Sequence, residues 1–151
     1  MKIAVFPGSF DPITRGHESV VNRASSLFDR IYVAIGINAN KKYLFDLATR
    51  KKFIEETFSS NSKIEVIDYQ KLTVELCHDL KANYIIRGLR NGTDYNFEYS
   101  ISEANRQMDD SIETIYLSTE AKYSAINSSI VRDIYRHNGD IKAFIPDAIN
   151  L

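Results

Sequence analysis

The sequence predicts an α/β fold, in which a single domain spanning residues 1–151 forms a doubly wound sheet of five parallel strands. The chain has 151 residues, close to the usual size of one domain. Short apolar runs rich in β-branched and aromatic residues alternate with stretches of helical spacing. Because repeated strand–helix alternation builds right-handed βαβ units, the strands are expected to lie parallel. None of the runs alternates cleanly between apolar and polar residues, which is typical of strands covered on both faces.

The expected strands are, in order, Ile3–Phe6, Ile31–Ile37, Ile64–Ile67, Tyr84–Ile86 and Thr114–Leu117. Each is followed by a stretch whose apolar residues recur at the spacing of one helix face. These faces consist of Val20, Val21, Ala24, Leu27 and Phe28 after the first strand, Phe53, Ile54 and Phe58 after the second, Leu72, Leu76 and Leu80 after the third, Phe97, Ile101, Ala104 and Met108 after the fourth, and Ile130, Val131 and Ile134 after the fifth. Gly139 is expected to close the last helix.

The composition excludes several classes of protein. Hydrophobic residues make up 44% and charged residues 26% of the chain, as in an ordinary globular protein rather than a disordered one. The net charge of −1 does not favour nucleic acid as a partner. No apolar run approaches the roughly 18 residues of a membrane helix, so we expect a cytoplasmic protein without a membrane partner. The single Cys77 excludes an internal disulfide and a paired-cysteine zinc site, and it is expected to pack in the core.

The glycines exclude two common phosphate-binding motifs. The closest pair among the six glycines, Gly88 and Gly92, is four residues apart, whereas the dinucleotide fingerprint G-x-G-x-x-G needs spacings of two and three. The P-loop needs Gly-Lys-Ser/Thr, and no glycine here precedes a lysine. A nucleotide bound by this sheet must therefore be held in another way.

Four polar clusters follow strands of the expected sheet, where ligands of open parallel sheets bind. They are Pro7–His17, Asn38–Lys42, Arg87–Arg90 and Tyr123–Ser129. The first contains Thr14-x-Gly16-His17 at a helix start, where free backbone N–H groups and the helix dipole attract anions. Gly16 lets a phosphate approach the backbone, and His17 can donate a hydrogen bond to it.

A second helix start, at Ser128 and Ser129, offers hydroxyl and N–H groups to an anion. With Lys41, Arg87 and Arg90 on the same edge, the clusters predict a polyphosphate site. Each has a plainer interpretation. His17 is by itself an ordinary surface residue, Ser128 or Ser129 an N-cap, Lys41-Lys42 a solvated pair, and Arg87 and Arg90 partners of Asp94 or Glu98 in a surface network. Their joint occurrence at one edge favours the site.

Three motifs resemble a known family. The run from Pro7 to His17, Pro-Gly-Ser-Phe-Asp-Pro-Ile-Thr-x-Gly-His, resembles the signature of the nucleotidyltransferase superfamily with a T/H-x-G-H motif. Ile-Ile-Arg-Gly-Leu-Arg at 85–90 and Ile-Asn-Ser-Ser-Ile-Val-Arg at 126–132 are similar to bacterial phosphopantetheine adenylyltransferases. The resemblance extends from Ile3 to about Pro146 and implies a Rossmann-like nucleotidyltransferase fold. Asn127, in place of the usual serine, Asn91-Gly92-Thr93, and Tyr123, where tryptophan is frequent, depart from the family pattern.

The resemblance implies an enzyme of coenzyme A biosynthesis that converts ATP and 4′-phosphopantetheine into dephospho-coenzyme A and pyrophosphate. It implies Mg²⁺ accompanying ATP, a homohexamer, and coenzyme A as a feedback inhibitor. His17 would stabilise the transition state at the α-phosphate. The positions expected to contact phosphopantetheine are Ser9, Lys41, Thr73, Arg87 and Asn105. Those expected to contact ATP are Ser9, Phe10, His17, Gly88, Leu89, Arg90, Glu98, Tyr123, Ser124, Ala125, Ile126, Asn127, Ser128 and Ser129.

The residue types suit this chemistry. The attacking phosphate is already an anion at neutral pH, so no strong base is needed, and no carboxylate pair stands out as a metal cage. Lys41 and Arg87 suit the acceptor phosphate, and Arg90 with the Ser128–Ser129 helix start suits the β- and γ-phosphates. We therefore expect His17, Lys41, Arg90 and Ser129 to be catalytic. Two alternatives remain: nucleotidyl transfer to another small phosphate, such as nicotinamide mononucleotide or glycerol phosphate, and a nucleotide sensor without catalysis.

Overall fold

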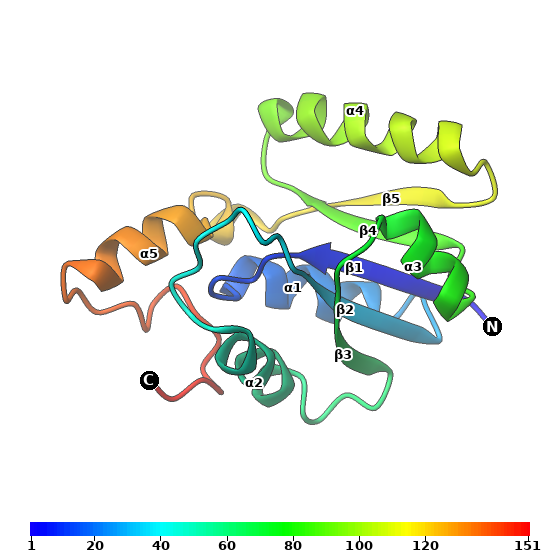
Figure 1. The fold of residues 1–151 in the computed structure, drawn as a ribbon. Helices are drawn as coiled ribbons and strands as arrows, with labels where there is room; N and C mark the ends of the chain where they lie inside the picture. Colours follow the sequence, from blue (N-terminus) through cyan, green and yellow to red (C-terminus); the bar gives the residue numbers. More distant parts are fainter.

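A computed structural model describes all 151 residues and confirms the predicted fold class. Five parallel strands form one sheet in the order β3-β2-β1-β4-β5 (Figure 1). The strands are β1 (Ile3–Gly8), β2 (Arg30–Gly36), β3 (Ile64–Tyr69), β4 (Tyr84–Leu89) and β5 (Glu113–Ser118). The helices are α1 (Arg15–Ala24), α2 (Leu47–Thr57), α3 (Thr73–Leu80), α4 (Gly92–Met108) and α5 (Ser128–Arg136), with a 3₁₀ turn at Ala121–Tyr123.

The chain reverses its direction of winding at β1. It runs outward from β1 through β2 to β3, then returns to the other side of β1 as β4 and continues to β5. A crevice therefore opens between the carboxyl ends of β1 and β4, where doubly wound sheets bind ligands. β4 is longer than expected, because its pairing with β5 continues to Leu89 opposite Ser118. The end of β4 therefore includes Arg87, Gly88 and Leu89, which do not form a free loop after the strand.

Two hydrophobic clusters lie on the two faces of the sheet. The larger has 19 buried residues and joins α1 and α2 with Val131 of α5 and with Ile141, Ile145 and Ile149 of the following segment. The smaller has eight buried residues and includes Val74, Leu76 and Cys77 of α3. Cys77 is fully buried, as expected, and burial raises the pKa of its thiol to about 12. No helix is long and apolar enough to cross a bilayer.

The prediction that α4 packs on the sheet through its apolar residues is wrong. Phe97, Ile101 and Met108 do share a face, but 67%, 39% and 52% of their surfaces are exposed. The only buried residue of α4 is Glu98. The physical reason is that β4 and β5 offer this helix polar partners, including Arg87 and a tyrosine hydroxyl, so its polar side faces the sheet.

Smaller differences occur in three other helices. Leu72 lies just before α3 and is exposed, so the helix packs through Val74, Leu76 and Cys77. Leu27 and Ile130 are also exposed, because α1 ends at Ala24 and α5 buries Val131 instead. After α5 the left-handed residue is Asn138, with φ of 59°. Gly139 closes the helix, because its backbone N–H donates a hydrogen bond to the Ile134 carbonyl at 2.9 Å.

Candidate active site

Two adjoining cavities occupy the crevice at the carboxyl ends of the strands. The larger, of about 360 Å³, lies among the β1–α1 loop, the end of β4 and the start of α5. The smaller, of about 280 Å³, lies among β1, β4, α3 and α4. Five residues belong to the linings of both cavities: Pro7, Gly8, Ser9, Arg87 and Glu98. The site is therefore divided into two compartments with a common wall.

The structure brings most of the predicted site residues to these cavities. The larger is lined by Ser9, Phe10, His17, Lys41, Arg87, Gly88, Arg90, Glu98, Ile126, Asn127, Ser128 and Ser129. The smaller is lined by Ser9, Thr73, Arg87, Glu98 and Asn105. Leu89, Tyr123, Ser124 and Ala125 line neither. Tyr123 ends the 3₁₀ turn, and the Ser124 hydroxyl donates to the Ala121 carbonyl at 2.8 Å.

His17 is held in one tautomer at the start of α1. The backbone N–H of Thr14, the N-cap, donates to His17 Nδ1 at 3.0 Å. Because that nitrogen accepts, a neutral ring carries its proton on Nε2. Burial, together with the nearby positive charges of Arg87 and Arg90, lowers the pKa of His17 to about 4. At neutral pH the ring is therefore an uncharged donor on the wall of the larger cavity.

Gly16 leaves room at the same helix start. An added Cβ would meet its nearest neighbours, Thr14 Oγ1 and Thr119 Cγ2, at 3.6 and 3.7 Å, which is ordinary contact. The folded protein alone does not require glycine here. A ligand that approaches the backbone of α1 supplies a reason for it.

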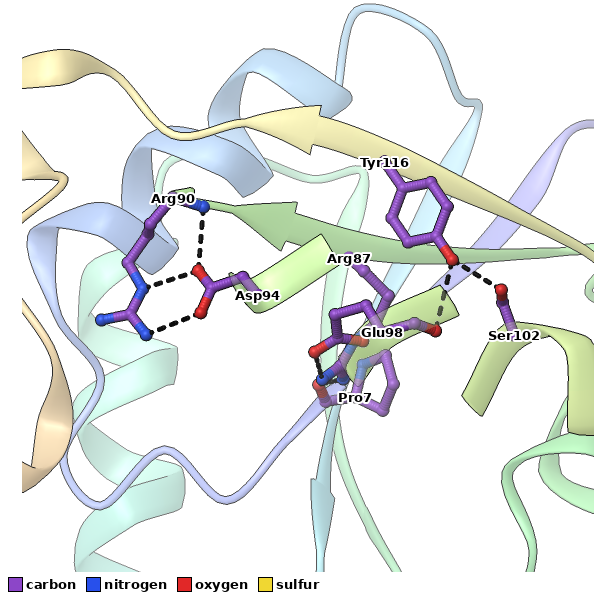
Figure 2. A network of polar contacts seen from close by, with 7 residues as sticks. All are labelled: Pro7, Arg87, Arg90, Asp94, Glu98, Ser102 and Tyr116. Atoms are coloured by element: carbon purple, nitrogen blue, oxygen red, sulfur yellow. Dashed lines mark hydrogen bonds and ion pairs between the residues drawn. The ribbon is translucent and has the colours of Figure 1, made fainter. Parts of the chain in front are cut away.

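Arg87 lines both cavities. Its guanidinium donates three hydrogen bonds to two neighbours, Glu98 and Pro7 (Figure 2). Its Nε and Nη2 each donate to one carboxylate oxygen of Glu98 at 2.6 Å, and Nη1 donates to the Pro7 carbonyl at 2.9 Å. Since an arginine carries five N–H donors, two remain for a ligand. Both oxygens of Glu98 are committed to Arg87, so this carboxylate orients the arginine.

Tyr116 fixes α4 over β5. Its hydroxyl lies 2.6 Å from Ser102 Oγ and 3.3 Å from the Glu98 carbonyl (Figure 2). Arg90 also has an acidic partner on α4, Asp94. The network of Arg87 and Arg90 with Glu98 and Asp94 therefore exists, but both arginines line a cavity rather than an open surface.

Lys41 lies at the edge of the larger cavity, with its Nζ donating to Ser9 Oγ at 3.0 Å. Because Ser9 lines both cavities, this contact places the lysine charge beside their border. A phosphate bound there would meet Lys41, Ser9 and the free edge of Arg87 together.

The start of α5 differs from the N-cap expectation. Asn127 is the N-cap, and its side chain accepts from the Ile130 N–H at 2.9 Å. Ser128 Oγ donates to the Pro12 carbonyl at 2.9 Å, and Ser129 Oγ accepts from Arg132 at 3.1 Å. Ser128 and Ser129 line the larger cavity, and their backbone N–H groups have no hydrogen-bond partner in the protein, which suits an anion.

Three residues that support the site were missed from the sequence. Asp11 is 1% exposed, and its carboxylate accepts from the N–H groups of Leu44 and Phe45 at 2.8 and 2.9 Å. Arg50 is 2% exposed and donates to the Ser9 carbonyl at 2.8 Å. Arg132 donates to the Asp11 carbonyl at 2.9 Å. Asp11 and Arg132 stand inside the quoted motifs, whereas nothing in the sequence distinguishes Arg50.

The segment after α5 holds the start of α1 from outside. The N–H of Arg15 donates to the Phe144 carbonyl at 2.9 Å, and its Nη2 donates to Asp147 at 2.6 Å. Arg15 is the variable residue of the Thr14–His17 motif, so this contact fixes the helix that carries His17. No group of three or more His, Cys, Asp or Glu residues is arranged to hold a metal ion.

Comparisons with known proteins show relatives in sequence and a solved structure with a similar fold. A family model described as cytidylyltransferase-like matches residues 5–134. A phosphopantetheine adenylyltransferase of Flavobacterium johnsoniae is 52% identical over 100% of this chain and 99% of its own length. One of Bacteroides thetaiotaomicron is 40% identical over the same shares. The crystal structure of a protein assigned as nicotinate-nucleotide adenylyltransferase from Vibrio parahaemolyticus has a TM-score of 0.73 at 21% identity, covering 98% of this chain and 96% of that one, a likeness of fold alone.

Proposed function

The chain belongs to the phosphopantetheine adenylyltransferase family, and from this membership we infer that it transfers the adenylyl group of ATP to 4′-phosphopantetheine, giving dephospho-coenzyme A and pyrophosphate. The observation that carries the proposal is the pair of cavities meeting at Arg87, beside a neutral His17. A two-substrate transfer needs two compartments that touch where the bond forms. This arrangement provides them.

We assign ATP to the larger cavity and phosphopantetheine to the smaller. The larger offers two helix N-termini with Arg90 and His17, which suits a triphosphate. The smaller has Thr73 and Asn105 on its wall, polar groups suited to the amides of a pantetheine arm. The acceptor phosphate would then lie at the common wall, between Lys41 and Arg87.

The reaction is an in-line displacement at the α-phosphorus of ATP. An oxygen of the acceptor phosphate forms the new P–O bond, and the bond to the bridging oxygen of pyrophosphate breaks. His17 Nε2–H donates to a non-bridging oxygen of the α-phosphate, where negative charge accumulates. Lys41 and Arg87 fix the acceptor, while Arg90 and the start of α5 with Ser129 hold the leaving pyrophosphate. Holding two reactants in line contributes roughly 7–11 kcal/mol.

We propose that Mg²⁺ enters as part of the substrate MgATP. The three carboxylates that line the cavities are all engaged, Asp94 and Glu98 by arginines and Asp11 by two backbone N–H groups. Mg²⁺ commonly keeps its waters and binds through substrate phosphates. Adding EDTA in excess over Mg²⁺ should therefore stop turnover while leaving the fold intact by circular dichroism.

We further propose that the protein is a cytoplasmic homohexamer inhibited by coenzyme A. The exposed apolar side of α4, with Phe97, Ile101 and Met108, supports a contact between copies. Coenzyme A contains both a pantetheine arm and an adenosine, so it fits the two cavities together. Native mass spectrometry measures the assembly, and titration with coenzyme A measures the inhibition.

The deciding experiment is mass spectrometry of a mixture of the protein, MgATP and 4′-phosphopantetheine, with pyrophosphate followed in parallel. Dephospho-coenzyme A and pyrophosphate should appear in equal amounts. ATP that binds without being consumed would contradict this acceptor, and nicotinamide mononucleotide and glycerol phosphate would then be screened. Pyrophosphate from none of these acceptors would indicate a sensor.

A further inference from the structure

The carboxylate of Asp94 accepts three hydrogen bonds from a single neighbour, Arg90 (Figure 2). Its Oδ2 accepts from the Arg90 backbone N–H at 2.9 Å and from Nε at 3.0 Å. Its Oδ1 accepts from Nη2 at 3.1 Å. Backbone and guanidinium of Arg90 are thus both fixed by one carboxylate, which leaves Nη1 and the second hydrogen of Nη2 for a ligand.

The carboxylate of Asp94 is itself held in place by α4. Asp94 is the third residue of this helix, and its N–H donates to the N-cap oxygen of Asn91 at 2.9 Å. One turn later, Glu98 binds Arg87 in the same bidentate way. Burial raises the pKa of Asp94, but the hydrogen bonds from Arg90 outweigh it and lower the pKa overall, so the group is ionised at neutral pH.

Asp94 also lines the larger cavity, where its negative charge faces the compartment assigned to ATP. A carboxylate beside a triphosphate repels it, so the residue weakens the binding of ATP in the ground state. Its side chain is 22% exposed, hence this repulsion is only partly screened by water. A carboxylate that weakens ATP binding in this way is compatible with efficient catalysis if it also stabilises the transition state.

We propose that Asp94 is a positioning residue for the adenylyl transfer: it holds Arg90 in the orientation that stabilises the departing pyrophosphate, while its own negative charge lowers the affinity for ATP. The proposal rests on the proposed function. It differs from a scaffolding role in one respect: removing the charge moves the affinity for ATP and the turnover number in opposite directions.

The test is Asp94→Asn, which keeps the size of the side chain and one acceptor oxygen. We expect kcat to fall about tenfold, part of the loss typical of one preorganised donor. The Kd of MgATP, measured by calorimetry, should tighten about two- to fivefold, as befits a partly exposed charge. The KM of phosphopantetheine should not change. Weaker ATP binding, or an unchanged kcat, would overturn the proposal.

Two controls separate positioning from stability and from net charge. Glu103→Gln removes one negative charge from the same helix, where Glu103 lies 3.8 Å from Arg106 and outside both cavities, and should leave kcat and Kd unchanged. In an Arg90→Ala background, Asp94→Asn should cause no further loss of kcat, since it acts through Arg90. Additive losses, or losses that follow the melting temperature, would show a scaffold only.

The same measurements distinguish failure of the inference from failure of the proposed function. If the wild-type protein releases no pyrophosphate with phosphopantetheine, the assigned reaction is wrong. The calorimetric comparison of Asp94→Asn with wild type still tests the repulsion, because it needs only MgATP. A Kd that does not tighten overturns the inference in either case.

Discussion

Replacing His17 by alanine tests the assigned chemistry most directly. In the folded protein Nδ1 accepts from the Thr14 N–H at 3.0 Å, so the single proton of the neutral ring is on Nε2, and alanine removes that donor. Loss of one preorganised donor to a transition-state oxygen costs about 2.7–4 kcal/mol, or about 10²–10³ in kcat. We expect a loss in this range, with the KM values changed much less.

The assay is pyrophosphate release at saturating MgATP and phosphopantetheine, with circular dichroism as a check on folding. Alanine also removes the acceptor of the Thr14 N–H, half of the capping box of α1, which should lower the free energy of unfolding by about 0.5–2 kcal/mol. His17→Gln, which keeps a polar side chain, serves as the comparison. A kcat within about threefold of wild type in a folded variant would refute the role of His17.

The pH dependence provides a second readout for the same residue. The pKa of His17 is lowered to about 4 in the folded state, whereas an unfolded histidine titrates near 6.5. Between these values the unfolded chain binds more protons, so the free energy of unfolding falls as the pH drops from about 6.5 to 4. His17→Gln should remove this part of the dependence, which urea titrations at about pH 7 and pH 5 would measure. An equal pH dependence in both proteins would contradict the neutral ring.

Four further substitutions test other parts of the site and fold. Lys41→Ala should raise the KM of phosphopantetheine and lower kcat, while calorimetry without acceptor finds the Kd of MgATP nearly unchanged; an equal loss in ATP binding would contradict its place beside the acceptor. Gly16→Ala should melt within a few degrees of wild type, because the Cβ meets nothing closer than 3.6 Å, yet bind MgATP more weakly by calorimetry; normal binding would show that no phosphate approaches this backbone. Gly139→Ala should lower the melting temperature, since its Cβ would lie 2.5 Å from Ile134 Cγ2. Gly92→Ala, in open space at the start of α4, should leave the melting temperature unchanged or raise it by the equivalent of about 0.4–1 kcal/mol. A lower melting temperature for Gly92→Ala than for Gly139→Ala would contradict the packing.

The sheet was predictable because its strands are short apolar runs. Neighbouring residues are buried in β1, β2 and β4, whereas the edge strands β3 and β5 are only partly buried but keep their apolar runs. Each expected strand overlaps an observed one, and only the ends differ by one to three residues. β4 shows why ends are harder: Arg87 and Gly88 are poor strand residues, and they extend only because β5 continues to pair with them.

Helix faces were less predictable, because periodicity states which residues share a side and not where that side points. Phe97, Ile101 and Met108 have correct helical spacing, but the sheet-facing side of α4 is chosen by Glu98 and its ion pair with Arg87. That pair joins residues eleven positions apart in the chain and depends on tertiary structure. The sequence allows Asp94 or Glu98 as a partner of Arg87, and only the tertiary structure selects Glu98 and turns it toward the sheet.

The site residues came from motifs that lie at strand ends, and most of them do line the two cavities. The residues that support the site, such as Arg50, could not be found from motifs in the same way. Arg50 resembles any surface arginine of an amphipathic helix, yet it is 2% exposed and 3.9 Å from the Tyr43 ring. Only the fold of the loop after β2 makes a buried partner for it.

The common wall formed by Arg87 and Glu98 has a consequence for the end of the catalytic cycle. Two separate substrates each lose translational freedom on binding, whereas the nucleotide product that joins them loses it once while touching both cavities. Each half of that product holds the other at a high effective concentration, so it should bind more tightly than either half alone. With the substrates placed as proposed, we therefore expect this product to dissociate more slowly than either substrate.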